Sequence, residues 1–223
     1  MRDLTLRAGS GKPLHILCLG AHADDIEIGC GGLILDLLER GLILNVHWVV
    51  FSASSVRTKE AKASARAFLA GAKAKTIRIH RFKDGFFPYD GARIKTAFET
   101  LKRSIPSPDL VLTHYRDDRH QDHRVVSDLT WNTFRDHFVL EYEIPKFDGD
   151  LGTPNCFVPL SRKTCIRKTQ HLETAFTTQN DKHWFSAETF LGLMRLRGVE
   201  CRAPEGYAEA FYARKIVLSA TQS

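Results

Sequence analysis

The sequence predicts an α/β fold with a largely parallel sheet and helices on both faces. Short apolar runs that suit buried strands alternate with longer amphipathic stretches that suit helices. This alternation continues over the first two thirds of the chain, which is typical of consecutive βα units. The chain has 223 residues, of which 43% are hydrophobic and 26% charged, enough for one α/β domain with a sizeable core.

The first strand is expected at 14–21, where LHILCLGA is apolar throughout, as in a parallel strand buried on both faces. A helix follows at 27–40, because its leucines and isoleucines recur on one face and Gly41 stands where a helix C-cap belongs. The run at 42–53 predicts the second strand. The Ala-rich periodic stretch at 57–72 predicts the second helix.

The third strand is expected at 75–82, followed by an amphipathic helix at 92–105 that two prolines terminate. The fourth strand is expected at 108–115, the fourth helix at 121–138 and a fifth strand at 139–147. These elements complete five β and four α segments in strict alternation.

The last third of the chain has a weaker pattern. We expect a loop at 148–156, helices at 162–176 and 186–197, and a late strand at 207–218. No repeat or linker divides the chain, so we predict a single domain over 1–223, in which 1–12 form a loose N-terminal arm.

Composition excludes several classes of protein. No stretch reaches the roughly 18 apolar residues of a membrane helix, and the N-terminus lacks the pattern of a signal peptide, so we expect no membrane association and a cytoplasmic location. The five cysteines form no CxxC pair, which argues against a disulfide framework. The net charge is +6, but the basic residues are spread along the chain. A nucleic-acid binder is an alternative; we expect instead a mild preference for anionic small molecules and no nucleic-acid partner.

Two polar clusters follow two of the predicted strands. HADDIE follows the first strand, and HYRDDRHQDH follows the fourth. In open parallel sheets, ligands bind at the carboxyl ends of the strands. We therefore expect the two clusters to lie side by side at one edge of the sheet.

The residue types in these clusters suit a catalytic metal site. His22 and Asp25 are three residues apart, and so are His120 and His123. Two histidines and one carboxylate, with one position left open, form a catalytic rather than a structural zinc site. Asp24 is then free as a general base, and the other histidine of the later pair is free for the oxyanion or the leaving group.

Asp122 lies between the two histidines of the later cluster, where it could orient one of them and hold it protonated. Together these groups suffice for metal-assisted hydrolysis of an amide or ester. The alternative is that Asp24 or Asp25 merely caps the following helix, and that Asp122 only favours a helix dipole. The glycines after the first cluster do not match GxGxxG, so we interpret them as allowing close helix–sheet packing.

The paired stretches AHADDIEIGCGG and HQDH resemble the motifs AHPDDxE and HxDH of the PIG-L/LmbE-like deacetylases, and AEAF near the C-terminus agrees. The resemblance covers most of the chain and implies a Rossmann-like three-layer fold. It also implies zinc, or sometimes iron, as the cofactor. The implied activity is removal of acetyl groups from N-acetylglucosamine-type amino sugars, and the family often forms homo-oligomers.

Carried over residue by residue, the resemblance makes His22, Asp25 and His123 the metal ligands, Asp24 the general base, His120 the oxyanion stabiliser and acid, and Asp122 its orienting carboxylate. The usual proline of the first motif is Ala23 here, which removes some rigidity from the turn but no metal donor. Glu27 completes that motif, and we expect it to support the loop without binding the metal directly.

Substrate contacts and rival functions stay open at this point. Arg57 and Tyr115 are the candidate substrate-binding residues, and His114 also ends the fourth strand. The substrate could be a nucleotide-linked amino sugar, a glycan fragment or another amide. A two-metal hydrolase would need Asp117 and Asp118 as further ligands. Two more functions compete with the deacetylase: a metal-dependent amidase or esterase that acts on a non-sugar substrate, and a non-catalytic sugar-binding module.

Overall fold

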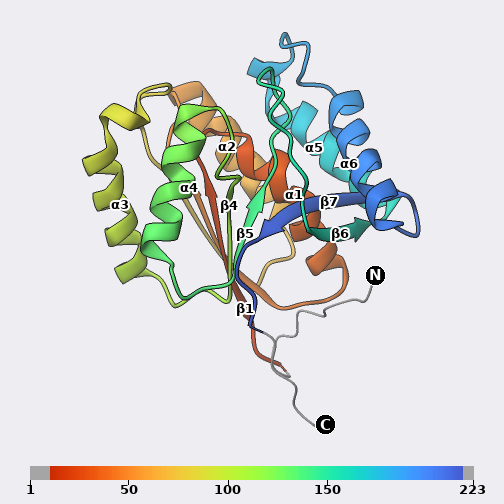
Figure 1. Cartoon of the computed structure of the whole chain (residues 1–223), viewed down its shortest axis with the longest axis horizontal. Coiled ribbons are helices and arrows are strands. Elements are labelled where there is room, and N and C mark those ends of the chain that lie inside the picture. The colour runs from red at the N-terminus through yellow and green to blue at the C-terminus, as the bar shows by residue number, and fades with distance from the viewer. Residues whose placement is uncertain (1–10, 218–223) are drawn as a thin grey trace.

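The computed structural model describes residues 11–217, and its centre is a seven-stranded sheet (Figure 1). The strand order is β3-β2-β1-β4-β5-β7-β6. The first five strands run parallel, whereas β7 is antiparallel to both of its neighbours. The strands are β1 (Leu14–Gly20), β2 (Leu44–Val50), β3 (Ala74–Ile79), β4 (Leu110–His114), β5 (Val139–Tyr142), β6 (Cys156–Leu160) and β7 (Tyr207–Ala213).

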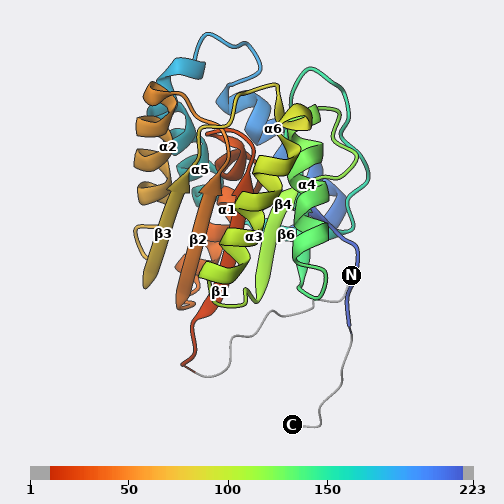
Figure 2. The same ribbon diagram turned by 90° about the vertical axis from the view of Figure 1, so that its left-hand side faces the viewer.

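Helices cover both faces of this sheet, so the predicted three-layer α/β fold is confirmed. Helices α3 and α4 lie on one face, and α1, α2, α5 and α6 lie on the other (Figures 1 and 2). The helices are α1 (Asp25–Glu39), α2 (Ser55–Phe68), α3 (Gly91–Ser104), α4 (Gln121–Thr133), α5 (Arg162–Ala175) and α6 (Ala187–Cys201), with short 3-10 turns η1 (Phe87–Tyr89) and η2 (Thr177–Gln179).

The central strand β1 divides the core in two. Its side chains alternate, so Ile16 and Cys18 enter the core under α1, while Leu17 and Leu19 enter the core under α3 and α4. All four are fully buried. A strand buried on both faces must be apolar at every position, which is why this stretch of sequence shows no alternation.

The sequence prediction differs from the structure mainly after residue 133. Helix α4 ends at Thr133 rather than at 138, β5 covers 139–142 only, and β7 ends at Ala213. The sequence pattern does not predict strand β6. It is a five-residue edge strand that contains Pro159, and its pairing with β7 comes from a segment about fifty residues later in the chain.

Helix α1 packs unusually closely against its neighbours. A Cβ atom at Gly29 would lie 2.1 Å from the ring of Tyr142, and one at Gly31 would lie 2.5 Å from Phe68. The predicted helix–sheet packing is therefore confirmed for Gly29, whose neighbour lies on β5, whereas Gly31 allows the close approach of helix α2. The two glycines let the start of the helix lie directly above the sheet edge that carries the polar clusters.

A buried ion pair between α5 and β7 also bonds to the backbone in the middle of α1. Both carboxylate oxygens of Glu209, from β7, accept backbone N–H groups of α1, from Gly32 and Leu33, at 2.7 Å each. The Lys168 ammonium, from α5, donates to the Ile28 carbonyl and, at 2.7 Å, to Glu209. The two charges thus satisfy one another and the polar backbone around them.

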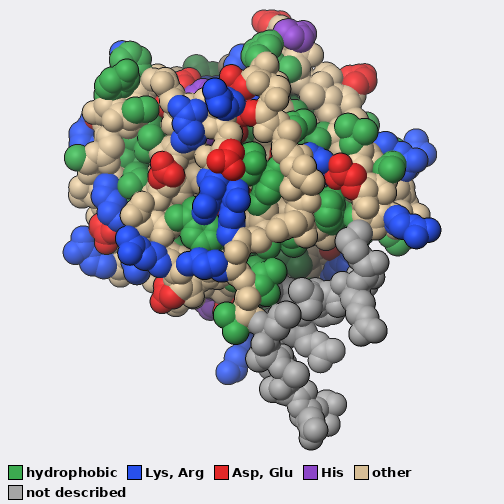
Figure 3. All heavy atoms as spheres, in the orientation of Figure 1, with side chains coloured by type: hydrophobic (Ala, Val, Ile, Leu, Met, Phe, Trp, Pro, Cys, Tyr) green, Lys and Arg blue, Asp and Glu red, His purple; other side chains and the backbone are tan. Residues whose placement is uncertain are grey.

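The surface is mixed in charge. On the face shown in Figure 3, Lys and Arg side chains form several separate groups with Asp and Glu between them. Within 11–217, no helix combines the length and the apolar character that crossing a membrane requires. Most of the expected N-terminal arm lies outside the described residues, and the single-domain organisation stays a prediction.

Candidate active site

The two polar clusters meet where the strand order reverses. β1 lies between β2 and β4, and its pairing with β4 aligns Cys18 with Leu112. The segments that leave these two strands therefore start next to each other, one leading to α1 and the other to α4. The predicted juxtaposition is confirmed, and it occurs at the switch point where open α/β sheets bind ligands.

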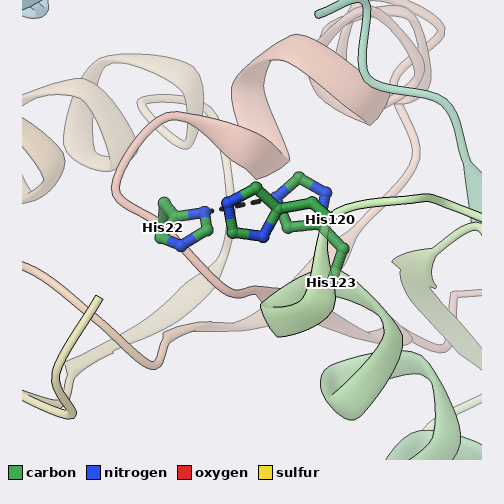
Figure 4. A group of neighbouring side chains, drawn as sticks. All are labelled: His22, His120 and His123. Carbon is green, nitrogen blue, oxygen red and sulfur yellow. Dashed lines mark hydrogen bonds between the residues drawn. The ribbon is translucent and has the colours of Figure 1, made fainter. Parts of the chain in front are cut away.

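The three predicted metal ligands converge in pairs. Nδ1 of His22 lies 3.2 Å from Nε2 of His123 and 3.4 Å from Oδ2 of Asp25, and Oδ1 of Asp25 lies 3.6 Å from Nε2 of His123. Figure 4 shows the His22 ring, from the loop after β1, facing the two histidines at the start of α4. The donors of a tetrahedral zinc site, with bonds of about 2.0–2.1 Å, are separated by about 3.3–3.4 Å. The two histidine nitrogens lie close to this spacing, and Asp25 contacts them through different oxygens, Oδ2 toward His22 and Oδ1 toward His123. The donor types suit zinc or a similar divalent ion.

A hydrogen bond to Asp118 orients the His123 ring so that its other nitrogen faces His22 and Asp25. Nδ1 lies 2.9 Å from Oδ2 of Asp118. The pKa of Asp118 is held well below its usual range: burial opposes this, but the hydrogen bond with His123 and the charges around it prevail. The ionised carboxylate can only accept, so Nδ1 carries the proton and the lone pair of Nε2 faces His22 and Asp25. Burial lowers the pKa of His123 to about 4, which keeps the ring neutral.

The same reasoning orients His22. Its Nε2 lies 3.1 Å from Asp84 and 3.2 Å from Asp122, both carboxylates, so this nitrogen donates. Nδ1 is then the atom that would contact a metal ion. Burial lowers the pKa of His22, but Asp25, Asp122 and Asp84 outweigh it and raise the pKa well above its usual value.

Asp24 occupies the N-cap position of helix α1, but its carboxylate does not cap the helix. Its side chain makes no capping bond, and Oδ1 instead accepts from Nη2 of Arg57 at 2.7 Å. Asp25 accepts from the backbone N–H of His22 at 2.6 Å and does not cap the helix either. The capping alternative is therefore wrong for both residues. Burial raises the pKa of Asp24, and Arg57 opposes that shift.

Asp122 does not orient His120 through its carboxylate, in contrast to the expectation from the sequence. The carboxylate accepts the backbone N–H groups of Gly85 at 2.7 Å and Phe87 at 3.1 Å and contacts His22. Side chains two positions apart at a helix start do not face each other, which explains the difference.

The backbone N–H of Asp122 does reach His120, where it donates to Nδ1 at 3.2 Å. Nδ1 therefore lacks a proton, and the neutral ring presents Nε2–H as a donor. Burial lowers the pKa of His120, so the structure favours a neutral donor over a protonated ring.

The two predicted substrate contacts have partners of their own. Arg57 is held by Asp24 and lies 3.2 Å from the Thr178 hydroxyl. Tyr115 stacks on Tyr212, with ring centroids 3.9 Å apart, and among the described residues no hydrogen bond joins its side chain to His22, Asp25 or His123. Contact of Arg57 or Tyr115 with a substrate stays a prediction.

Three residues at the site have roles that the sequence does not reveal. His114 is fully buried, and its Nε2 accepts from the Ala21 N–H at 2.9 Å and lies 3.2 Å from Asp25. The sequence presents Asp118 only as a ligand to a second metal, yet it bonds to His123. The motif resemblance does not include Asp84, which reaches His22 from a loop sixty residues away.

Glu27, in the first turn of α1, is fully buried, and neither of its carboxylate oxygens has a hydrogen-bond partner among the described residues. Burial raises its pKa to about 8, so the side chain is neutral at pH 7. In agreement with the sequence expectation, Glu27 does not belong to the groups of side chains that could hold an ion. Those groups are His22, His120 and His123; Asp25, His114 and His123; and His22, Asp84 and Asp122. The three ligands that the sequence predicts do not form one of these groups together, but His123 belongs both to a group with His22 and to a group with Asp25.

The chain resembles known proteins in sequence and in fold. The chain is 28% identical over 151 residues to the "Uncharacterized deacetylase YaiS" of Escherichia coli K12, a match that covers 64% of this chain and 80% of that protein. Its fold resembles the N,N'-diacetylchitobiose deacetylase of Pyrococcus horikoshii, with a TM-score of 0.67 and 21% identity over 90% of this chain and 83% of that one.

The same fold also carries another chemistry. The 4-carboxy-2-hydroxymuconate hydratase GalB of Pseudomonas putida KT2440 has a TM-score of 0.72 and 16% identity, over 94% of this chain and 100% of that one. At such identities, the structural likeness establishes the fold alone. The match to the family described as "PIG-L: GlcNAc-PI de-N-acetylase" spans residues 17–134, more than half of the chain, and includes both polar clusters. The chain therefore belongs to the PIG-L family of deacetylases.

Proposed function

We propose that this protein is a metal-dependent N-deacetylase that removes the acetyl group from an N-acetylated amino sugar and releases acetate and a free amine. Zinc is the proposed ion, with Fe²⁺ as the alternative. The observation that carries the proposal is the convergence of His22, Asp25 and His123, with donor pairs 3.2–3.6 Å apart, beside the carboxylate of Asp24.

His22 Nδ1, His123 Nε2 and a carboxylate oxygen of Asp25 would hold the ion. When bound, a divalent ion polarises a carbonyl and lowers the pKa of water, which provides a nucleophile at neutral pH. Asp118 and the pair Asp84 and Asp122 keep the two imidazoles in the tautomers that this role requires.

Asp24 moves the proton. Its Oδ1 is bonded to Arg57, and its Oδ2 has no hydrogen-bond partner within 11–217. Oδ2 takes a proton from the attacking water molecule as oxygen adds to the acetamide carbon. The carbon–nitrogen bond then breaks, and Asp24 returns the proton to the departing amine.

His120 stabilises the charge that develops on the carbonyl oxygen. Its ring lies 4.8 Å from that of His22 and 4.5 Å from that of His123, centroid to centroid. Because Nδ1 accepts from the backbone, Nε2–H is the donor offered to the oxyanion. A donor held in place in a water-poor site stabilises the transition state more than water does.

The proposed substrate is a GlcNAc-type sugar, either linked to a nucleotide or part of a glycoconjugate. The family description and the chitobiose deacetylase support this class. The net charge of +6 suits a phosphate-bearing substrate. The hydratase with the same fold makes a direct assay of the reaction necessary.

The test is metal analysis of the purified protein together with amine release from N-acetylglucosamine, its nucleotide-linked form and N,N'-diacetylchitobiose. About one zinc or iron per chain and chelator-sensitive amine release support the proposal. Metal without release from any of these rejects the amino-sugar substrate and favours an amidase or esterase on another compound. Absence of metal after zinc is added back rejects the metal site itself.

A cytoplasmic location, assembly into a homo-oligomer and the absence of a nucleic-acid partner remain predictions of the sequence.

A further inference from the structure

A lysine outside both sequence motifs reaches the carboxylate that orients His123. Lys146 lies in the loop after β5, and its side chain is only 8% exposed. Because β5 is parallel to β4 and paired with it, this loop leaves the sheet at the same edge as the loop that carries Asp118. Nζ of Lys146 lies 3.1 Å from Oδ2 of Asp118.

Asp118 bonds to both histidines of the second motif. Oδ2, the oxygen that contacts Lys146, also accepts from Nδ1 of His123 at 2.9 Å. Oδ1 accepts from the backbone N–H of His120 at 2.7 Å. The carboxylate of Asp118 thus fixes the ring orientation of His123, the proposed metal ligand, and the backbone position of His120, the proposed oxyanion donor.

Lys146 separates Asp118 from a second carboxylate. The same ammonium is bound by Asp150, and Asp148 lies 4.0 Å away. Asp150 also accepts from the backbone N–H of Arg119 at 2.7 Å, which fastens it to the loop beside Asp118. Without the ammonium, two buried carboxylates would face each other across a short gap, and like charges in a poorly solvated region repel strongly.

We infer that Lys146 is a positioning residue: it holds Asp118 against His123 by neutralising the repulsion from Asp150, and so sets the orientation in which His123 meets the metal. This inference rests on the proposed metal site and identifies a residue that neither motif contains. A carboxylate behind a ligating histidine typically changes metal affinity 10–100-fold when it is lost. Lys146 should show a comparable, indirect effect.

The test compares Lys146→Met, which keeps most of the side-chain stem, with Lys146→Arg, which keeps the charge. A third variant combines Lys146→Met with Asp150→Asn, which removes the repulsion while the amide oxygen can still accept from Arg119. Lys95→Met is the matched control, since Lys95 forms an ion pair with Glu99 on α3, away from the site. The measurements are the zinc dissociation constant of the metal-free proteins, by competition with a chelator, and the ¹⁵N signals of His123 in the histidine-labelled proteins.

We expect Lys146→Met to weaken zinc binding about tenfold or more, and the His123 signals to lose the pattern of a ring protonated at Nδ1. Lys146→Arg and the double variant should bind zinc within about threefold of the wild type, and Lys95→Met should be unchanged. Lys146→Met with wild-type affinity and wild-type His123 signals would overturn the inference. So would a loss that Asp150→Asn does not relieve.

If Lys146→Met does not fold, as judged by circular dichroism, zinc binding by the double variant tests the inference instead. Zinc binding within about threefold of the wild type then supports the inference, and a loss greater than tenfold overturns it. If the wild-type protein binds no zinc, the proposed function is rejected. If the wild type and Lys146→Met bind zinc equally well, only the inference about Lys146 is rejected.

Discussion

Nη2 of Arg57 lies 2.7 Å from Oδ1 of Asp24, although 33 residues separate them in the chain. Arg57 stands at the start of α2 and Asp24 immediately before α1, so the contact joins the turns that enter two neighbouring helices. Of the two carboxylate oxygens of Asp24, only Oδ1 accepts from Arg57. The arginine thus fixes the carboxylate while the other oxygen remains available for proton transfer.

Replacing Arg57 should therefore act on turnover more than on substrate affinity. We expect Arg57→Met to lower kcat about tenfold with a smaller change in KM, and Arg57→Lys to fall in between, because an ammonium cannot reproduce the planar guanidinium contact. Steady-state amine release measures both constants, and Arg66→Met, on the exposed side of the same helix, is the control. A rise in KM alone would indicate that Arg57 binds the substrate instead.

Removing the carboxylate of Asp24 should separate catalysis from metal binding. We expect Asp24→Asn to keep the metal of the wild type and to lose roughly 10²-fold or more in kcat, the usual effect of a lost acid–base group. Metal content and amine release are measured on the same preparation. Asp36→Asn, in the helix that follows Asp24, is the control. Near-normal turnover of Asp24→Asn contradicts its role as the base.

Metal affinity should depend on pH through His22. The pKa of this ring is raised, because Asp25, Asp122 and Asp84 outweigh the effect of burial, so at neutral pH the metal-free protein carries a proton on Nδ1. That proton must leave before Nδ1 can bind an ion, so affinity falls as pH falls. We expect the zinc dissociation constant to increase about tenfold per pH unit on acidification below the pKa of His22. Calorimetry in buffers of different ionisation enthalpy should show the released proton, and a pH-independent constant would rule out His22 as a ligand.

Glu27 should make the metal-free protein less stable as pH rises. Its pKa is raised to about 8 in the folded state, so the native protein binds a proton that the unfolded chain releases near its ordinary pKa. The native state then loses up to about 1.4 kcal/mol of stability per pH unit between these two values. Glu27→Gln should be more stable than the wild type in urea at pH 8, and the difference should shrink at pH 5. A stability difference that is the same at pH 5 and at pH 8 would contradict the raised pKa of Glu27.

The glycines of α1 should not tolerate a side chain. A Cβ at Gly29 would meet the Tyr142 ring at 2.1 Å, so we expect Gly29→Ala to reduce the free energy of unfolding by about 1–3 kcal/mol. Gly192 of α6 has no atom within 4 Å of such a Cβ, and Gly192→Ala should stabilise by about 0.5–1 kcal/mol through helix propensity. Equal effects of the two substitutions in urea titrations would contradict the packing argument.

The sequence predicted the parallel half of the fold and the meeting of the two motifs, because buried strands and crossover helices leave strong periodic patterns. It did not predict β6, whose partner is distant in sequence. It also assigned the carboxylate of Asp122 to His120, because nothing local reveals that Gly85 and Phe87, at the start of η1, donate their backbone N–H groups to that carboxylate. Contacts made by Asp84 and Lys146 depend on loop paths, which a sequence pattern does not specify.

The ion pair between Lys168 and Glu209 has a consequence for the order of events during synthesis. The helix that begins with Asp25, a proposed metal ligand, is synthesised before β7, yet two of its amides are bonded to Glu209 in that strand. A nascent chain that stops short of β7 leaves Lys168 buried without its counter-charge, or exposed to water with the helix still loose. We therefore expect the proposed metal site to form only after β7 has left the ribosome, which would keep an incomplete chain from binding a metal ion.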